Sequence, residues 1–106
     1  MEHVRLAQKR KFSPEKMTKV GLFDTDRLFC DLYCFEPGQS QSVHAHAGSD
    51  KVYLVLEGTG EFSVGGETAS LAAGEAVLAP AGADHGVTNP GPNRLIVYVF
   101  MTPKPH

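Results

Sequence analysis

Three histidines in this sequence have the spacing of a metal site. His44 and His46 are separated by one residue, and His85 lies in a later segment. Alternate residues of a β-strand point to the same face with Cα atoms roughly 7 Å apart, so two such imidazoles can bind one cation through bonds of about 2 Å. A third ligand must come from another segment, and residues 76–80, which lead towards His85, can bring it alongside. The spacing therefore predicts a metal site held by His44, His46 and His85.

The residues around these histidines resemble the two sequence motifs of the cupin family. The first motif, residues 38–58, is matched at every fixed place except position 51, by Gly38, His44, His46 and Gly58. The second motif, residues 74–89, is matched completely, by Gly74, Pro80, Gly82, His85 and Asn89. The chain thus resembles a small single-domain cupin of the cupin 2 conserved-barrel type, with residues 1–106 as one domain. The resemblance implies a jelly-roll β-barrel in which the motif histidines bind metal.

One motif position departs from the family. Where cupins usually have a glutamate as fourth protein ligand, this chain has Lys51, preceded by Asp50. An ammonium about 4 Å from another unit charge is disfavoured by roughly 4 kcal/mol at an effective dielectric of 20, and by about twice that beside a divalent ion. Lys51 therefore has to turn away, lose its proton or pair with an anion. Two alternatives remain open: Asp50 turns inward as the missing ligand, or Lys51 opens a strand at the rim while Asp50 caps a turn.

Short strands and turns dominate the rest of the chain. Residues 52–56 and 95–101 are nearly continuous apolar runs, and residues 62–68 predict a hairpin around two glycines. Ser13 followed by proline predicts a helical turn over residues 13–16. No amphipathic segment of helix length is present in the sequence. The pattern predicts an all-β, single-domain jelly-roll barrel with at most a short N-terminal helical turn.

Residues 27–36 alternate between two largely apolar faces. One face holds Leu28, Cys30, Leu32 and Cys34, and the other holds Phe29, Asp31, Tyr33 and Phe35. A strand covered on both sides suits a barrel whose outer surface packs against another strand or subunit. The face with Phe29, Tyr33 and Phe35 and the run of residues 95–101 are interpreted as apolar outer faces of the barrel. Because they are too apolar to leave in water, the sequence predicts a homodimer, as is common among cupins.

Composition and charge limit the cellular compartment and the kinds of partner that the sequence predicts. No run approaches the ~20 apolar residues of a membrane span, the N-terminus lacks the apolar core of a signal peptide, and Cys30 and Cys34 are too far apart along a strand to form a disulfide. These features predict a cytoplasmic protein without a membrane partner. Six of the ten Lys and Arg residues lie within residues 1–19. We interpret them as a solvated edge that blunts strand pairing rather than as a nucleic-acid surface.

The predicted site favours a metal-dependent function. Three neutral imidazoles leave a divalent ion such as Fe, Ni, Zn or Mn with two or three positions open to water, dioxygen or an anion. A three-histidine site also resembles the thiol dioxygenases, cupins that lack the glutamate. The leading hypothesis is a metalloenzyme, a dioxygenase or isomerase, acting on a small anionic or thiol-bearing metabolite whose charge is met by Lys51. The alternatives are a non-catalytic module that binds a small molecule or metal, and a metal-free structural barrel.

No catalytic base is evident from the sequence. The three tyrosines, Tyr33, Tyr53 and Tyr98, lie among apolar strand residues and are interpreted as core residues. The catalytic residues are therefore left unassigned at this point.

Overall fold

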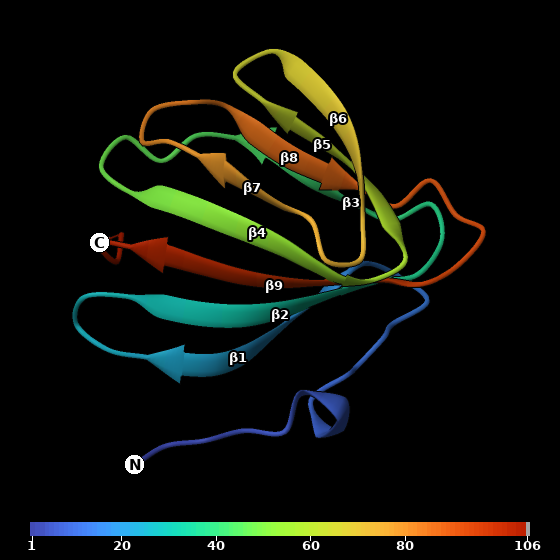
Figure 1. Ribbon diagram of the computed structural model, residues 1–106, viewed down its shortest axis with the longest axis horizontal. Coiled ribbons are helices and arrows are strands. Elements are labelled where there is room, and N and C mark those ends of the chain that lie inside the picture. Colours follow the sequence, from blue (N-terminus) through green and yellow to red (C-terminus); the bar gives the residue numbers. More distant parts are fainter. Residues whose placement is uncertain (106) are drawn as a thin grey trace.

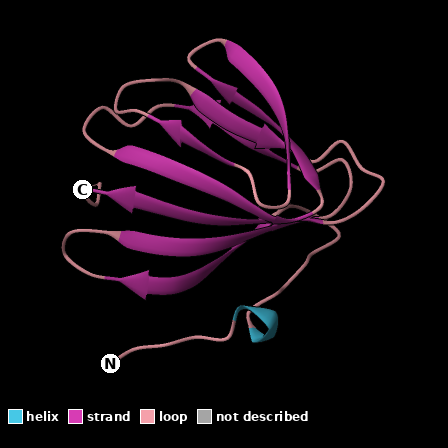
Figure 2. Cartoon of the chain, viewed as in Figure 1, coloured by secondary structure: helices cyan, strands magenta, loops and turns pink. Residues whose placement is uncertain are grey.

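The structure is a computed structural model that describes residues 1–105, in which two antiparallel sheets face each other (Figure 1). The first sheet has the order β1-β2-β9-β4-β7, formed by Thr18–Asp24, Phe29–Phe35, Leu95–Thr102, Asp50–Glu57 and Ala76–Ala79. The second has the order β3-β8-β5-β6, formed by Ser40–His44, His85–Thr88, Thr59–Val64 and Glu67–Ala72. Figure 2 shows that strands make up most of the chain. The predicted all-β jelly-roll barrel is confirmed.

The alternation in β2 separates an inner from an outer face. Tyr33 and Phe35 are buried in the core between the sheets, whereas Cys30, Leu32 and Cys34 belong to a second buried cluster on the outside of the first sheet. The expectation that Tyr33 and Phe35 lie on an apolar outer face is therefore wrong. The outer cluster is covered by the chain's own N-terminal segment, through Val4, Leu6 and Phe12, and both cysteine thiols there are free.

The N-terminal segment contains its helical turn at a different place from the one expected. A single 3-10 turn, η1, spans Leu6–Gln8 and lies below β1 and β2 in Figure 1. The helical turn predicted for residues 13–16 is wrong, since these residues bend towards β1. Ser13 Oγ accepts a hydrogen bond from the Glu15 N–H, but its carbonyl accepts one from the Gln39 side chain and so does not continue a helix. Within residues 1–105 no helix is long and apolar enough to cross a membrane.

Two tight turns fix the register of the strands. Gly65 and Gly66 both have positive φ, 58° and 85°, which confirms the expected hairpin between β5 and β6. Gly58 has φ 82°, and a Cβ built there would come within 2.2 Å of the Arg94 carbonyl oxygen. Only glycine therefore allows β4 to turn into β5 against the start of β9.

Candidate metal centre

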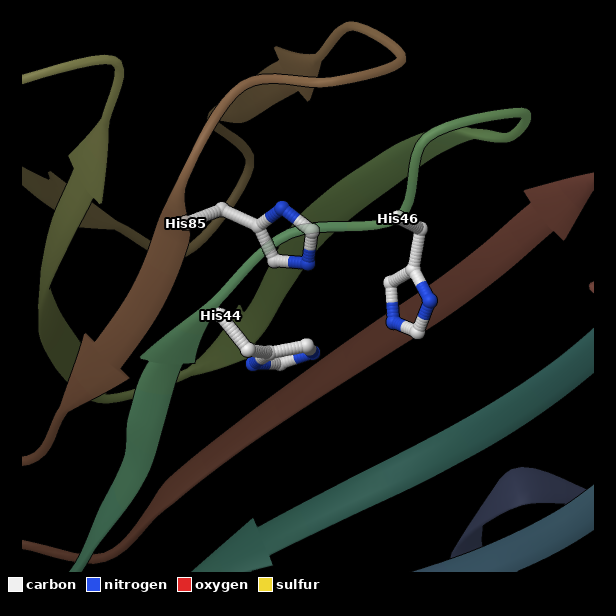
Figure 3. A group of neighbouring side chains, drawn as sticks. All are labelled: His44, His46 and His85. Carbon is white, nitrogen blue, oxygen red and sulfur yellow. The ribbon is translucent and has the colours of Figure 1, made fainter.

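The three motif histidines converge at one end of the barrel (Figure 3). His44 is the last residue of β3, His46 follows in the loop, and His85 opens β8, where it is the register partner of His44. One ring nitrogen from each lies within 4.8 Å of the other two. The H-x-H spacing predicted that His44 and His46 share a regular strand. This prediction is wrong, because β3 ends at His44. The topology nevertheless brings all three predicted ligands together.

Hydrogen bonds orient two of the imidazoles. His44 Nδ1 lies 2.7 Å from the Ser42 carbonyl oxygen, and His85 Nδ1 lies 3.1 Å from the Ala83 carbonyl oxygen. A carbonyl only accepts, so each Nδ1 carries the proton and each Nε2 presents a lone pair. Metal-binding histidines are commonly fixed in this way through the second ring nitrogen.

The remaining nitrogen of His85 has no protein partner. His85 is 2% exposed, and its Nε2 is the one buried side-chain nitrogen or oxygen within residues 1–105 without a hydrogen bond. Burial is the main cause that lowers the pKa of His85 to about 4, so the ring is neutral near pH 7. A neutral, desolvated lone pair facing two further imidazoles fits a metal ligand.

The loop before His85 is tied to the first motif. The Gly82 N–H donates to the His46 carbonyl at 2.9 Å, and the Ala81 N–H donates to Asp50 Oδ1 at 2.8 Å. Asp50 is exposed, and it is not part of the metal-competent group formed by the histidines. The alternative that Asp50 supplies the missing carboxylate ligand is therefore wrong: its carboxylate holds the second loop in place from outside.

Lys51 points into the barrel. Its side chain is 1% exposed, and its register partners Ala79 and Met101 are buried as well. The ammonium lies 5.1 Å from the ring centroid of Tyr33 and 5.0 Å from that of Tyr53. None of the ion pairs formed between described residues includes Lys51. The alternative that Lys51 opens outward at the rim is wrong.

Burial and a second lysine both act on Lys51. Burial is the largest cause that lowers its pKa to about 8, Lys19 lowers it further, and Asp31 opposes the shift. The two tyrosines beneath it are neutral, since burial raises the pKa of Tyr33 to about 12 and raises that of Tyr53 as well. Lys51 thus stays largely charged at pH 7 and lacks a carboxylate in ion-pair contact.

The tyrosines belong to a small buried network. Tyr53 donates to Gln41 Oε1 at 3.0 Å, and Gln41 Nε2 donates to the Tyr33 hydroxyl at 3.2 Å. Both rings are buried in the main core cluster. The interpretation of Tyr33 and Tyr53 as core residues agrees with these positions, and Gln41 sets the orientation of both hydroxyl groups.

Asp31 is an inward-facing carboxylate that the sequence interpretation missed. It pairs with Gly21 and Val99 in the sheet and shares the inner face with Tyr33. Burial raises the pKa of Asp31, and the charges of Lys19 and Lys51 act against that increase. The alternation in the sequence does put Asp31 on the same face as Phe29, Tyr33 and Phe35, but that face was interpreted as the outer one.

A groove leads to the histidines from the side of β1. Its volume is about 920 Å³, and it is lined by Lys11, Ser13, Lys16, Met17, Thr18, Lys19, Val20, Ser40, Gln41, Ser42, His44 and His46. The basic residues near the N-terminus were expected to form a solvated edge. Three of them, Lys11, Lys16 and Lys19, are exposed, as expected, and they also line this groove.

Known proteins share this fold and sequence pattern. Residues 31–101 match the family described as a cupin domain. Among curated proteins, an uncharacterized protein of Streptomyces coelicolor is 34% identical over 69% of both chains. A 5-nitrosalicylic acid 1,2-dioxygenase of Bradyrhizobium is 33% identical over 76% of this chain, which spans only 38% of that protein.

Solved structures agree with this relationship. The crystal structure of TT1209 from Thermus thermophilus superposes with a TM-score of 0.96 at 47% identity, covering 99% of this chain and 100% of the other. A double-stranded β-helix protein from Klebsiella pneumoniae superposes with a TM-score of 0.89 at 24% identity, covering 95% and 89% of the two chains. With the motif residues meeting at one end of a jelly-roll barrel, the chain belongs to the cupin domain family.

Proposed function

We propose that His44, His46 and His85 bind one divalent first-row transition metal, such as Fe, Ni, Zn or Mn. The observation that carries this proposal is the buried, unpartnered Nε2 of His85, which faces the other two imidazoles. An unsatisfied buried nitrogen is disfavoured by roughly 1–3 kcal/mol. A metal ion satisfies it and uses the lone pairs that the Nδ1 hydrogen bonds leave on His44 and His85.

Lys51 shapes what else binds at this site. Three neutral imidazoles leave the full charge of the ion, and the usual glutamate is replaced by a buried cation. Two positive charges in one small space favour an anionic partner. We infer that a small anionic or thiol-bearing metabolite binds beside the metal, with its negative charge facing Lys51.

The reaction class that we propose is a dioxygenase. For this reaction the bound metal would be Fe, Ni or Mn and not Zn, which has no redox chemistry, and it would supply a Lewis-acidic, redox-active centre with positions open to dioxygen and substrate. Support comes from the Bradyrhizobium relative, whose name describes a 1,2-dioxygenase acting on an aromatic acid. Lys51 would hold the acid group of the substrate, and the buried rings of Tyr33 and Tyr53 would exclude water behind it.

Metal analysis and oxygen uptake test this proposal. Protein purified without chelator or affinity tag should contain near-stoichiometric first-row metal. With the metal present, oxygen consumption should appear with a member of a panel of aromatic acids, thiols and diketones. Metal without oxygen uptake would leave a non-catalytic binding module, and protein that takes up no metal would leave a structural barrel; the first result contradicts the dioxygenase and the second contradicts the metal site.

We also propose a homodimer, on part of the surface that the sequence suggested, residues 95–101, and not on the face of Tyr33 and Phe35. Tyr98 and Phe100 on β9 are only partly buried on the outside of the first sheet, next to Leu54 on β4, and Leu78 on β7 is 54% exposed. These side chains form an apolar strip that the N-terminal segment does not fully cover. Light scattering at micromolar concentration should give twice the monomer mass, and Leu78→Asp should lower it. A monomeric wild type would contradict the proposal.

A further inference from the structure

The groove beside the histidines carries more positive charge than one metal-bound anion needs. Lys11, Lys16 and Lys19 all line it, and no aspartate or glutamate is among its lining residues. We call it the lysine groove. None of the ion pairs formed within residues 1–105 involves these three lysines. Acidic side chains are more numerous than basic ones in the chain as a whole, 12 against 10, so the imbalance in the groove is local.

The charge continues from the lysine groove to the metal centre. The Lys19 ammonium lies 5.3 Å from the ring centroid of Tyr33, and the Lys51 ammonium lies 5.1 Å from the same centroid. One aromatic ring thus contacts two cations. Asp31 is the carboxylate that interacts with both ammonium groups, so two positive charges are opposed by one negative charge. Lys19 and Lys51 are like charges that act on each other, and an anion bound beside them relieves this repulsion.

The groove also ends at the histidines themselves. His44 and His46 form part of its lining, so a ligand that binds at the metal centre extends into the groove without crossing another strand. The intervening wall is mostly polar, with Ser40, Gln41 and Ser42 from β3. An extended ligand with a charged group at each end matches this distribution of charge.

We propose that the lysine groove binds a second anionic group of the metabolite whose first anionic group binds at the histidines. The ligand class is then a dicarboxylate or a phosphorylated carboxylate, and not a simple monoacid. This proposal rests on the proposed function for the first group only. Lys11, Lys16 and Lys19 determine specificity by recognising the distal charge.

Calorimetric titration of the metal-loaded protein tests the proposal with four probes: propionate, succinate, glutarate and 3-phosphonopropionate. We expect the better of succinate and glutarate, or the phosphonate, to bind at least about tenfold more tightly than propionate at low salt. The triple variant Lys11→Gln, Lys16→Gln, Lys19→Gln should reduce that preference below about threefold. A stronger response to the phosphonate identifies a phosphorylated ligand, and a stronger response to the diacids identifies a dicarboxylate.

A matched variant separates local from overall charge. Arg5→Gln, Lys9→Gln and Arg27→Gln remove the same charge from residues that do not line the groove. This variant should keep the full preference for the two-charge probes. An equal loss in both triple variants, or a wild type that binds propionate as tightly as the other probes, would overturn the proposal.

Binding measurements on the metal-free protein test the lysine groove separately from the metal centre. Inorganic phosphate should bind to the metal-free wild type more tightly than to the Lys11, Lys16 and Lys19 triple variant. Metal binding without any preference for two-charge probes overturns the lysine groove alone. Phosphate binding that depends on the three lysines, in a chain that takes up no metal, supports the groove and overturns the metal centre.

Discussion

The two ends of the barrel interior differ in chemistry although the same strands build both. At the closed end, β2, β4 and β9 contribute Phe35, Val55 and Leu95, each fully buried. At the open end, the same strands contribute Asp31, Lys51 and Met101, and the charge of Lys51 acts on His46 and His85. Tyr33 and Tyr53 lie between the two ends and join them through Gln41.

Each of these strands therefore stabilises the fold at its closed end and contributes to the candidate site at its open end. Apolar contacts at the closed end gain roughly 25 cal/mol for each Å² of surface removed from water. At the open end, the buried ammonium of Lys51 and the unpartnered imidazole nitrogen of His85 lower stability in the absence of a ligand. The molecule therefore tolerates an unfavourable open end because the closed end holds the sheets together.

The largest expected effect comes from the closed end. Phe35→Ala should destabilise the fold by about 3–5 kcal/mol, because it opens a cavity in a fully packed region. Urea unfolding measures this change. The folded fraction should still bind metal with unchanged stoichiometry. Loss of metal from protein that remains folded would show that the two ends are not independent.

A smaller effect of opposite sign is expected at the open end. Lys51→Met should stabilise the metal-free protein by about 1–3 kcal/mol at pH 7, since it removes a buried ammonium without a carboxylate partner. The sign follows from the lowered pKa of Lys51: below the unfolded value of 10.5, the unfolded chain binds the proton more tightly than the folded one. Lys9→Met, at a partly exposed site, is the control and should change stability by less than about 0.5 kcal/mol. A destabilised Lys51→Met protein would contradict this account of the open end.

Metal affinity should respond to the same position. Lys51→Glu restores the carboxylate that cupins usually have and removes a repulsive charge, so it should tighten metal binding by at least about tenfold. Calorimetric titration with one metal compares it with the wild type and with Lys104→Glu, whose charge lies in a surface ion pair. An affinity equal to that of the wild type would mean that Lys51 does not act on the metal.

The smallest expected effect is a pH dependence of the metal-free protein. The pKa of His85 is about 4 in the folded state against 6.5 ordinarily, so the unfolded chain binds the proton more tightly. Stability from His85 is fully present above about pH 6.5 and is lost as the pH falls towards 4. Between pH 7 and pH 6 the change should be under about 1 kcal/mol. Unfolding curves of wild type and His85→Gln should diverge as the pH rises above 4; parallel pH profiles would contradict the assignment.

Much of the fold and part of the site could be predicted from the sequence. Alternation in residues 27–36 indicated the strand β2, and motif spacing indicated the three histidines and marked Lys51 as the departure at the fourth ligand position, with its orientation left open. Alternation alone does not say which face is inward, however, so the face that carries Phe29, Asp31 and Phe35 was interpreted as the outer one. That choice depends on the N-terminal segment, which covers Cys30 and Leu32 through contacts distant in sequence.

The lysines show a second limit of the sequence. A solvated basic segment has the same composition whether or not its lysines line a groove. Lys11, Lys16 and Lys19 line a groove with β3 only because β1 and β3 are edge strands of the two facing sheets. Residues 13–16 form no helical turn for a similar reason, because the distant Gln39 side chain donates a hydrogen bond to the Ser13 carbonyl. The turn that is present spans Leu6–Gln8.

The most direct test of the metal centre is elemental analysis of three proteins purified in parallel without chelator or tag: wild type, His85→Ala and His3→Ala. His3 is exposed and is not one of the three grouped histidines, so it controls for the loss of a histidine as such. We predict close to one first-row metal ion per chain in wild type and His3→Ala, and almost none in His85→Ala, with all three folded by circular dichroism. Equal metal content in wild type and His85→Ala would contradict the proposed site.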